Sequence, residues 1–319
     1  MAWLLAAALI VLGLLLTLGA EVGALSARTY RALGTSSDDH SGEYLLPRHP
    51  APLDPAAAAA AALLAMEVHE ALSARAKGAP SASLLAKIEV IDSSRKGACG
   101  VGVHGGELLV VFRGTLTFEE LQRNDFGTQF LAAGSDVEWL ARLGLPLPFP
   151  QQTALAEGAP RIQVNEAFLT TLLEVEEAVR QAAARLPTGA PLWVAGHSLG
   201  AAVAALFAAR RVLARDALAP RLRLLLLACP KVGNREFREL LLQVPCVHFV
   251  NENDAIPALP FAAMPDFAGS GTLEYVAPPA PQTFSFIGPT LLACHSTYAY
   301  ITGLSQFLVP PAAKRAAPP

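Results

Sequence analysis

The chain has 319 residues, of which 53% are hydrophobic and 16% charged, and its formal net charge is -3. This length suits one large α/β domain or two small ones, and the apolar content is sufficient for a sizeable core. The small negative charge gives no electrostatic basis for binding nucleic acid. The spacing of the cysteines is not typical of a metal site, and we expect buried free thiols in preference to any disulfide. The cysteines are Cys99, Cys229, Cys246 and Cys294.

The N-terminal segment is strongly hydrophobic. Residues 2–20 carry no charge, and as a helix rising ~1.5 Å per residue they would span ~28 Å, close to the thickness of a bilayer core. A signal peptide usually begins with basic residues, but the first basic residue here is Arg28. We therefore predict an uncleaved single-pass membrane anchor, with Arg28 and Arg31 favouring a cytoplasmic catalytic part. The alternative is a signal peptide cut after Ala20, which predicts a secreted or periplasmic protein.

A linker and a long helix are expected next. Residues 21–54 are polar and aperiodic, which is typical of a linker. Residues 55–77 are rich in Ala and Leu and predict a helix, with Asp54 as its N-cap and Pro55 at its first position. We expect this helix to pack against the main sheet.

The following residues alternate in the manner of strands. Residues 86–91 predict one strand, and residues 99–112 predict a β-hairpin that turns at His104, Gly105 and Gly106. Residues 117–126 favour a short helix, whereas residues 127–160 show no clear element.

The remaining elements alternate between helix and strand. Residues 165–186 predict a long amphipathic helix whose acidic residues come early and basic residues late, as suits the helix dipole. The later elements are strands over 191–195, 222–229 and 247–250, and helices over 201–209, 236–242 and from about Ser296. This alternation predicts a mostly parallel central sheet flanked by helices. We expect one domain over 55–309 and a flexible tail over 310–319.

The pattern Gly-x-Ser-x-Gly occurs once between a predicted strand and a predicted helix, at residues 196–200. A serine on such a tight turn exposes its hydroxyl, and the glycines let the backbone pass closely. In parallel sheets the functional site lies beyond the carboxyl ends of the strands, which is where Ser198 falls. Ser198 is therefore the candidate nucleophile of a serine hydrolase.

A serine nucleophile needs a base, and in the α/β-hydrolase plan the base comes last in the chain. After the elbow histidine His197, whose side chain should point away from the Ser198 hydroxyl, the histidines are His248 and His295. His248 alternates within a strand and favours a buried structural role. His295 lies in a predicted loop before the last helix, and we predict it as the base.

The orienting acid should follow a strand and precede the base. Glu252 and Asp254 come directly after the predicted strand 247–250. We prefer Asp254, which begins a Pro-containing loop, with Glu252 as the alternative and Asp266 as a third candidate. The oxyanion needs preorganised N–H groups, and we predict those of Leu199, after the nucleophile, and Thr115, after an early strand.

Taken together, these residues resemble the fungal-type (class 3) triacylglycerol lipases, which are α/β-hydrolases. The resemblance covers about residues 85–305 and includes five motifs in order. They are the strand and oxyanion turn 110–115, the elbow 196–201, the segment 228–234, the acid segment 250–260 and the His-x-x-Tyr of 295–298. The resemblance favours Asp254 over Glu252 as the acid and supports Thr115 as an oxyanion donor.

Two positions depart from the family pattern. The chain has Val-Asn-Glu-Ala-Phe at 164–168, where the family commonly has Val-His-x-Gly-Phe, and Glu120-Leu121 stand where the family has Asp-Trp. Both departures concern the region of the acyl cleft or lid, which leaves the substrate preference open. Family lids follow the oxyanion turn, so residues 116–130 would be the lid here, with an ordinary surface helix as the alternative.

The resemblance implies a serine hydrolase that cleaves carboxylic esters of lipids, triacylglycerols or other acylglycerols, through a Ser-Asp-His triad and an acyl-enzyme. It implies a lipid ester substrate at a membrane or lipid interface, and no metal or cofactor. A phospholipase or acyltransferase on the same fold is an alternative, and so is a non-catalytic hydrolase-fold scaffold held at the membrane. The oligomeric state is not predicted.

Overall fold

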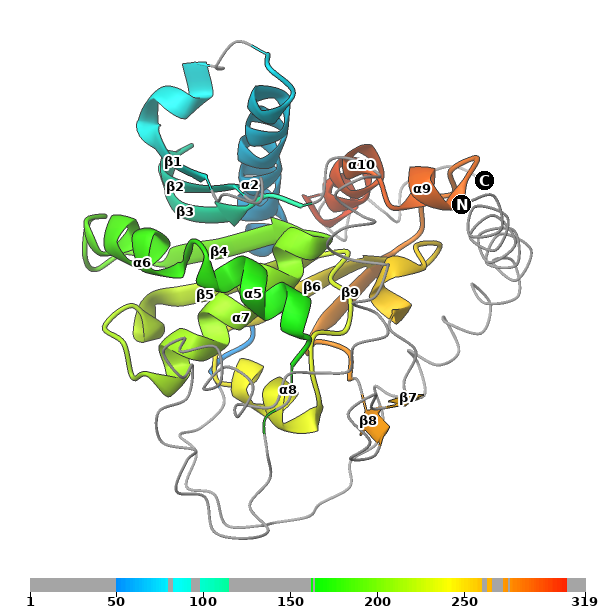
Figure 1. Cartoon of the computed structure of the whole chain (residues 1–319). Helices are drawn as coiled ribbons and strands as arrows, with labels where there is room; N and C mark the ends of the chain where they lie inside the picture. Colours follow the sequence, from blue (N-terminus) through cyan, green and yellow to red (C-terminus); the bar gives the residue numbers. More distant parts are fainter. Residues whose placement is uncertain are drawn as a thin grey trace, which may run out of the picture.

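The computed structural model describes residues 50–79, 83–92, 98–114, 162, 164–259, 263–265, 272–274 and 276–308. Its main feature is a seven-stranded sheet in the order β1-β2-β3-β4-β5-β6-β9 (Figure 1). The first three strands pair antiparallel, and from β3 onward every pairing is parallel. The strands are β1 (Ile88–Asp92), β2 (Ala98–His104), β3 (Glu107–Phe112), β4 (Leu192–His197), β5 (Leu222–Leu227), β6 (Cys246–Asn251) and β9 (Pro281–Phe284). The short strands β7 (Ala263–Pro265) and β8 (Thr272–Glu274) pair antiparallel outside this sheet.

Helices cover both faces of the sheet, which explains why its central strands are mostly apolar on both faces. One face packs against α5 (Glu166–Leu173), α6 (Glu176–Ala184), α7 (Leu199–Leu213) and α8 (Arg235–Leu241). The other face packs against α2 (Pro55–Ala76) and α10 (Thr297–Leu308). The shorter elements are α9 (Leu291–Cys294) and the 3-10 helices Ser83–Lys87, Ala219–Arg221 and Ile256–Ala258.

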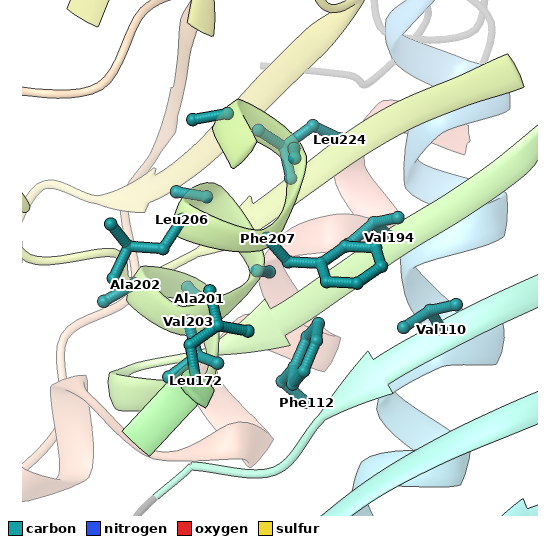
Figure 2. Packing of buried hydrophobic residues seen from close by; sticks show 14 of the residues in the cluster. Val110, Phe112, Leu172, Val194, Ala201, Ala202, Val203, Leu206, Phe207 and Leu224 are labelled. Atoms are coloured by element: carbon teal, nitrogen blue, oxygen red, sulfur yellow. The ribbon is translucent and has the colours of Figure 1, made fainter. Parts of the chain in front are cut away.

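The α7 helix is the centre of the larger core. Alanine is the commonest of its buried residues, and these small side chains let the helix axis approach β4 and β3 closely. Phe207 of α7 packs against Phe112 at the end of β3, with ring centroids 5.6 Å apart. Figure 2 shows these two rings together with Val110 and Val194 from adjacent strands. This packing holds the end of β3 against the middle of α7.

The predicted helix over 55–77 is confirmed, including its N-cap. The Asp54 carboxylate accepts the Ala57 N–H at 2.9 Å, and Pro55 occupies the first turn. By length and composition α2 could cross a membrane, but 61% of its most apolar window is buried inside the fold. Its apolar content is therefore explained by packing on the sheet. The predicted anchor, residues 2–20, lies outside the described residues.

The prediction of one helix over 165–186 is wrong, because the helix is interrupted between α5 and α6. The Val175 N–H bonds to the Leu172 carbonyl at 3.0 Å, a tighter turn than that of an α-helix. Leu172, Val175 and Val179 are all buried on the same side. Because the apolar period continues across the interruption, the sequence pattern does not reveal it.

The start of α6 also carries a buried ion pair. The Glu176 carboxylate contacts Arg211, and one of its oxygens lies 2.6 Å from a guanidinium nitrogen of Arg210, both arginines being on α7. All three side chains are largely buried. A buried charge is tolerated only when it is paired, so this contact joins α6 to α7.

The other predicted elements that fall on described residues are confirmed, with small shifts. The predicted strand 86–91 begins two residues later, because Ser83–Lys87 forms a 3-10 helix. The hairpin turns at Gly105 and Gly106, whose φ angles of 59° and 86° suit a two-residue turn. The predicted short helix 117–126 and the predicted lid 116–130 lie outside the described residues.

The predicted structural roles of His248 and of the cysteines are confirmed. His248 is fully buried in β6, and its Nε2 accepts the Cys229 N–H at 3.2 Å. Burial lowers the pKa of His248 to about 3. Cys99, Cys229, Cys246 and Cys294 are all free and buried.

We predict that the free energy of unfolding decreases as the pH is lowered, and that His248→Gln makes this decrease smaller. The unfolded chain binds a proton below the ordinary histidine pKa of about 6.5, whereas native His248 stays neutral down to about 3. The contribution of neutral His248 to the free energy of unfolding is therefore fully present above pH 6.5. It decreases as the pH drops below 6.5, by up to about 1.4 kcal/mol per pH unit. Glutamine keeps an acceptor for the Cys229 N–H but does not titrate. Urea unfolding of both proteins at pH 7.5 and 5.0 measures the difference, and equal pH dependence would contradict the assignment.

Candidate active site

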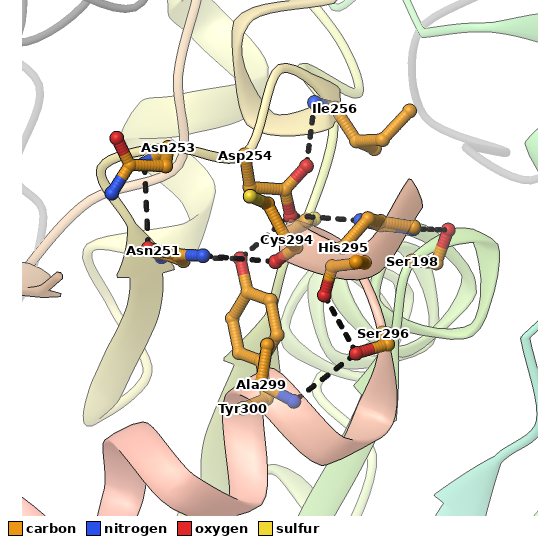
Figure 3. A network of polar contacts seen from close by, with 12 residues as sticks. Ser198, Asn251, Asn253, Asp254, Ile256, Cys294, His295, Ser296, Ala299 and Tyr300 are labelled. Atoms are coloured by element: carbon orange, nitrogen blue, oxygen red, sulfur yellow. Dashed lines mark hydrogen bonds and ion pairs between the residues drawn. The ribbon is translucent and has the colours of Figure 1, made fainter. Parts of the chain in front are cut away.

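Ser198 lies on a strained turn between β4 and α7. Its φ of 58° and ψ of -126° place a non-glycine residue in a sparsely populated region. It occupies the N-cap position of α7, but its side chain makes no capping hydrogen bond. The hydroxyl is directed instead toward His295 (Figure 3).

The two glycines of the elbow are required by close backbone contacts. A Cβ added to Gly196 would overlap the backbone of Gly200 and lie 2.6 Å from the Ala201 nitrogen. A Cβ added to Gly200 would overlap the Phe112 carbonyl oxygen at the end of β3. The pattern Gly-x-Ser-x-Gly thus follows from three backbone segments that meet within van der Waals distance.

The structure brings Ser198, His295 and Asp254 together. The Nε2 atom of His295 lies 2.8 Å from the Ser198 Oγ, and its Nδ1 lies 2.7 Å from the Asp254 Oδ2. The Asp254 carboxylate is thus the one that contacts His295, whereas Glu252 lies part-exposed in the turn after β6. Asp266 is outside the described residues.

The buried Asp254 carboxylate is surrounded by donors. Besides His295, the Tyr300 hydroxyl donates to its Oδ2 at 2.8 Å, and the Ile256 N–H donates to its Oδ1 at 2.9 Å. The residue is only 4% exposed. Since a buried carboxylate is costly without partners, these donors make its ionised form tolerable.

Tyr300 was not found from the sequence. The resemblance had drawn attention to Tyr298 in the His-x-x-Tyr motif, but that side chain is 68% exposed. Tyr300 lies on the inner side of α10 and is fully buried. A tyrosine on the core-facing side of a helix needs a partner for its hydroxyl, and this requirement is the sequence signal that could have identified Tyr300.

Asn251 connects the strands to the histidine segment. It is the last residue of β6 and fully buried. Its amide nitrogen donates to the carbonyls of Phe286 at 3.0 Å and Cys294 at 2.9 Å, and its amide oxygen accepts the Phe286 N–H at 3.0 Å. Its backbone N–H donates to the Tyr300 hydroxyl at 3.2 Å. These bonds fix the residue that precedes His295.

A row of imidazole rings continues behind His295. The His197 ring lies 4.8 Å from that of His295 and 5.7 Å from that of His69, between ring centroids. Burial lowers the pKa of His197 well below its ordinary value, and the neighbouring His295 and His69 add to this effect. His197 is therefore neutral at neutral pH.

His69 was also missed, because the sequence indicated only a packing role for its helix. Its Nε2 accepts the N–H of Gly114, the second residue after β3, at 3.1 Å. A histidine on an otherwise Ala- and Leu-rich buried face was the signal that could have found it.

The two predicted oxyanion donors differ in how far the structure describes them. Leu199 is the first residue of α7, so its N–H belongs to the positive end of that helix, next to Ser198. Thr115 lies outside the described residues, which end at Gly114 on this side. Its role stays a prediction.

The fold and the site define the class of the protein. A mostly parallel sheet flanked by helices, with a strained serine between β4 and α7, is the α/β-hydrolase fold. Residues 109–264 match the model of a family described as lipase (class 3). The predicted resemblance to the class 3 lipases is thereby confirmed, and the protein is a carboxylic ester hydrolase. The match supports the hydrolysis of lipid esters.

Solved fungal lipases are among the similar structures. The lipase of Rhizomucor miehei in its propeptide complex is 15% identical with a TM-score of 0.48, and the match covers 86% of this chain and 90% of that one. The lipase of Rhizopus microsporus var. chinensis is 16% identical with a TM-score of 0.48, and the match covers 86% of this chain and 97% of that one. The mono- and diacylglycerol lipase of Aspergillus oryzae is 20% identical with a TM-score of 0.41, and the match covers 63% of each chain. No match is found among curated proteins.

We predict that Tyr300→Phe destabilises the fold, whereas Tyr298→Phe does not. The first change removes the hydroxyl that donates to Asp254 and accepts the Asn251 N–H. A buried donor without a partner costs about 1–3 kcal/mol. The second change affects an exposed tyrosine on the same helix and serves as the matched control. Thermal or urea unfolding measures both variants, and equal stabilities would contradict the assigned network.

Proposed function

We propose that the protein hydrolyses acylglycerols or related lipid esters through an acyl-enzyme on Ser198. The observation that carries the proposal is the position of the His295 ring, which contacts the Ser198 hydroxyl with one nitrogen and the Asp254 carboxylate with the other. A serine hydroxyl is a poor nucleophile near neutral pH and needs such a base. The family match at residues 109–264 supports a lipid ester as the substrate.

In the proposed first step, the Ser198 oxygen attacks the ester carbonyl carbon while His295 Nε2 takes the hydroxyl proton. His295 then gives this proton to the leaving alcohol, and the acyl group stays on Ser198. In the second step a water molecule attacks the acyl-enzyme while His295 takes its proton, and the fatty acid leaves as His295 gives that proton to the Ser198 oxygen. Asp254 holds the imidazole with its proton on Nδ1 and stabilises the imidazolium that forms.

The negative charge on the carbonyl oxygen needs donors that are already in place. We assign this role to the backbone N–H groups of Leu199 and Thr115. The position of Leu199 at the start of α7 supports the first assignment, because the helix dipole favours negative charge there. The resemblance of residues 110–115 to the family's oxyanion turn supports the second.

We predict that Ser198→Ala lowers the turnover of a short p-nitrophenyl ester by about 10³-fold or more. The same variant should lose labelling by a fluorophosphonate probe, because the reacting oxygen is gone. Ser305→Ala, an exposed serine on α10, is the control and should keep both properties. Persistent labelling of Ser198→Ala would mean that another residue is the nucleophile.

The same assays test the acid and the substrate class. Asp254→Asn should lower turnover by about 10²–10⁴-fold, because the imidazole loses its orienting charge, whereas Glu252→Gln should not. The reverse result would make Glu252 the acid. Glycerides and phospholipids of graded chain length, with Ser198→Ala as the blank, then show which lipid ester is cleaved. Preferred release of fatty acid from phospholipids would contradict the acylglycerol assignment.

We further propose that residues 2–20 anchor the enzyme in a membrane, on the basis of their length and lack of charge. We predict that the full-length protein stays in the membrane pellet after extraction with alkaline carbonate. A variant that begins at residue 50 should be soluble under the same conditions. Release of a shortened protein whose N-terminus is residue 21 would instead indicate a cleaved signal peptide.

A further inference from the structure

His69 occupies a position beside the proposed site that the mechanism above does not use. It lies on α2, is 5% exposed, and its Nε2 accepts the N–H of Gly114. Gly114 directly precedes Thr115 in the chain. We propose that His69 is a positioning residue that fixes the backbone turn carrying the second oxyanion donor. This inference rests on the proposed function.

The Gly114 residue is held from two sides. His69 accepts its N–H on one side, and on the other the His197 carbonyl oxygen packs so closely that a Cβ at Gly114 would lie 2.6 Å from it. His197 directly precedes the nucleophile Ser198. The contact therefore places the turn after β3 against the backbone of the elbow. Donors for an oxyanion act well only if their positions are set before the reaction, and this contact limits where the next N–H can lie.

The role of His69 depends on which ring nitrogen carries the proton. Because the Gly114 N–H is a donor, Nε2 must be unprotonated, and the neutral ring then has its proton on Nδ1. The Glu70 Oε1 lies 3.9 Å from this Nδ1, which is within ion-pair range though too long for a hydrogen bond. Its contact with His69 lowers the pKa of Glu70 to about 2, so the carboxylate is ionised at neutral pH. The negative charge favours the tautomer with Nε2 as acceptor.

The Glu70–His69 pair is a looser counterpart of the Asp254–His295 pair, because Glu70 is half-exposed and lies 3.9 Å from Nδ1 of its histidine, whereas the buried Asp254 lies 2.7 Å from Nδ1 of its own. In each pair a carboxylate faces Nδ1 and leaves Nε2 as an acceptor, toward the Ser198 hydroxyl in one case and toward a backbone N–H in the other. The neutral, buried His197 ring separates the two imidazoles. One pair moves a proton in the proposed reaction, and the other holds the peptide group beside it.

Three substitutions of His69 distinguish its role as the acceptor of the Gly114 N–H from a role in packing alone. In His69→Gln the amide oxygen reaches the place of Nε2 and can accept the Gly114 N–H. In His69→Leu no acceptor remains, and in His69→Asn the oxygen reaches only the place of Nδ1. Glu67→Gln is the matched control, because it removes a carboxylate beside a different histidine, His104, at the hairpin end of β2.

We expect His69→Leu and His69→Asn to lower kcat for the p-nitrophenyl ester by about 10- to 100-fold, somewhat less than the loss of a whole oxyanion donor. KM should stay within about twofold, and inhibition by an alkyl boronic acid, which forms a tetrahedral adduct on serine, should weaken by the same factor as kcat. His69→Gln should recover most of the lost kcat, and Glu67→Gln should match the wild type. Melting temperatures show which variants are folded.

Equal kcat values for the Gln, Leu and Asn variants, at whatever level, would overturn the positioning role. So would a loss of kcat that leaves boronic acid inhibition unchanged. If Ser198→Ala is inactive in the same assay, such a result leaves the proposed hydrolysis standing. Turnover that persists in Ser198→Ala would instead overturn the proposed reaction itself.

Discussion

The backbone turn at Ser198 is the constraint on which the rest of the site depends. A serine with a φ of 58° is strained by about 1–3 kcal/mol, and such strain persists only when the surroundings hold it. Here Gly196 and Gly200 let β4, α7 and the end of β3 approach so closely that any side chain would collide with backbone. The packing of the buried α7 on β3, β4 and β5 maintains this contact. The favourable packing of the core thus offsets the backbone strain that holds the Ser198 hydroxyl at the edge of the sheet.

Asp254 and His295, the proposed acid and base, are held by a second set of contacts. Asp254 follows β6, whereas His295 precedes α10, and the two elements are joined by Asn251 and Tyr300. Every polar atom of the Asn251 side chain is bonded to backbone of the segment around His295 or Phe286. Because these groups are buried, each lost bond would leave an unpaired polar atom. The network therefore resists any shift of the carboxylate relative to the imidazole.

Much of the fold was predictable because its signals are local. The capping residue Asp54, the glycine turn at the hairpin and the apolar strands each depend on a few neighbouring residues. The order of residues in the chain reduced the candidate base to His248 or His295, and the strand pattern around His248 then favoured His295. The interruption at Val175 was not predictable, because the apolar period continues through it. Tyr300 and His69 were not predictable as partners either, because their contacts join α10 and α2 to residues 46 and 45 positions away.

By itself, the sequence determined the candidate nucleophile Ser198, the order of its candidate partners and the resemblance to class 3 lipases, because each of these is read from short motifs and their order in the chain. The tertiary structure alone decided which of the two acids after β6 contacts His295. It also decided that Asn251 and Tyr300 support that acid and that a histidine of the first described helix bonds to the turn after β3. The physical reason is that a hydrogen bond depends on distance in space, and only the packing of helices on both faces of the sheet brings these residues within 3 Å or so of one another.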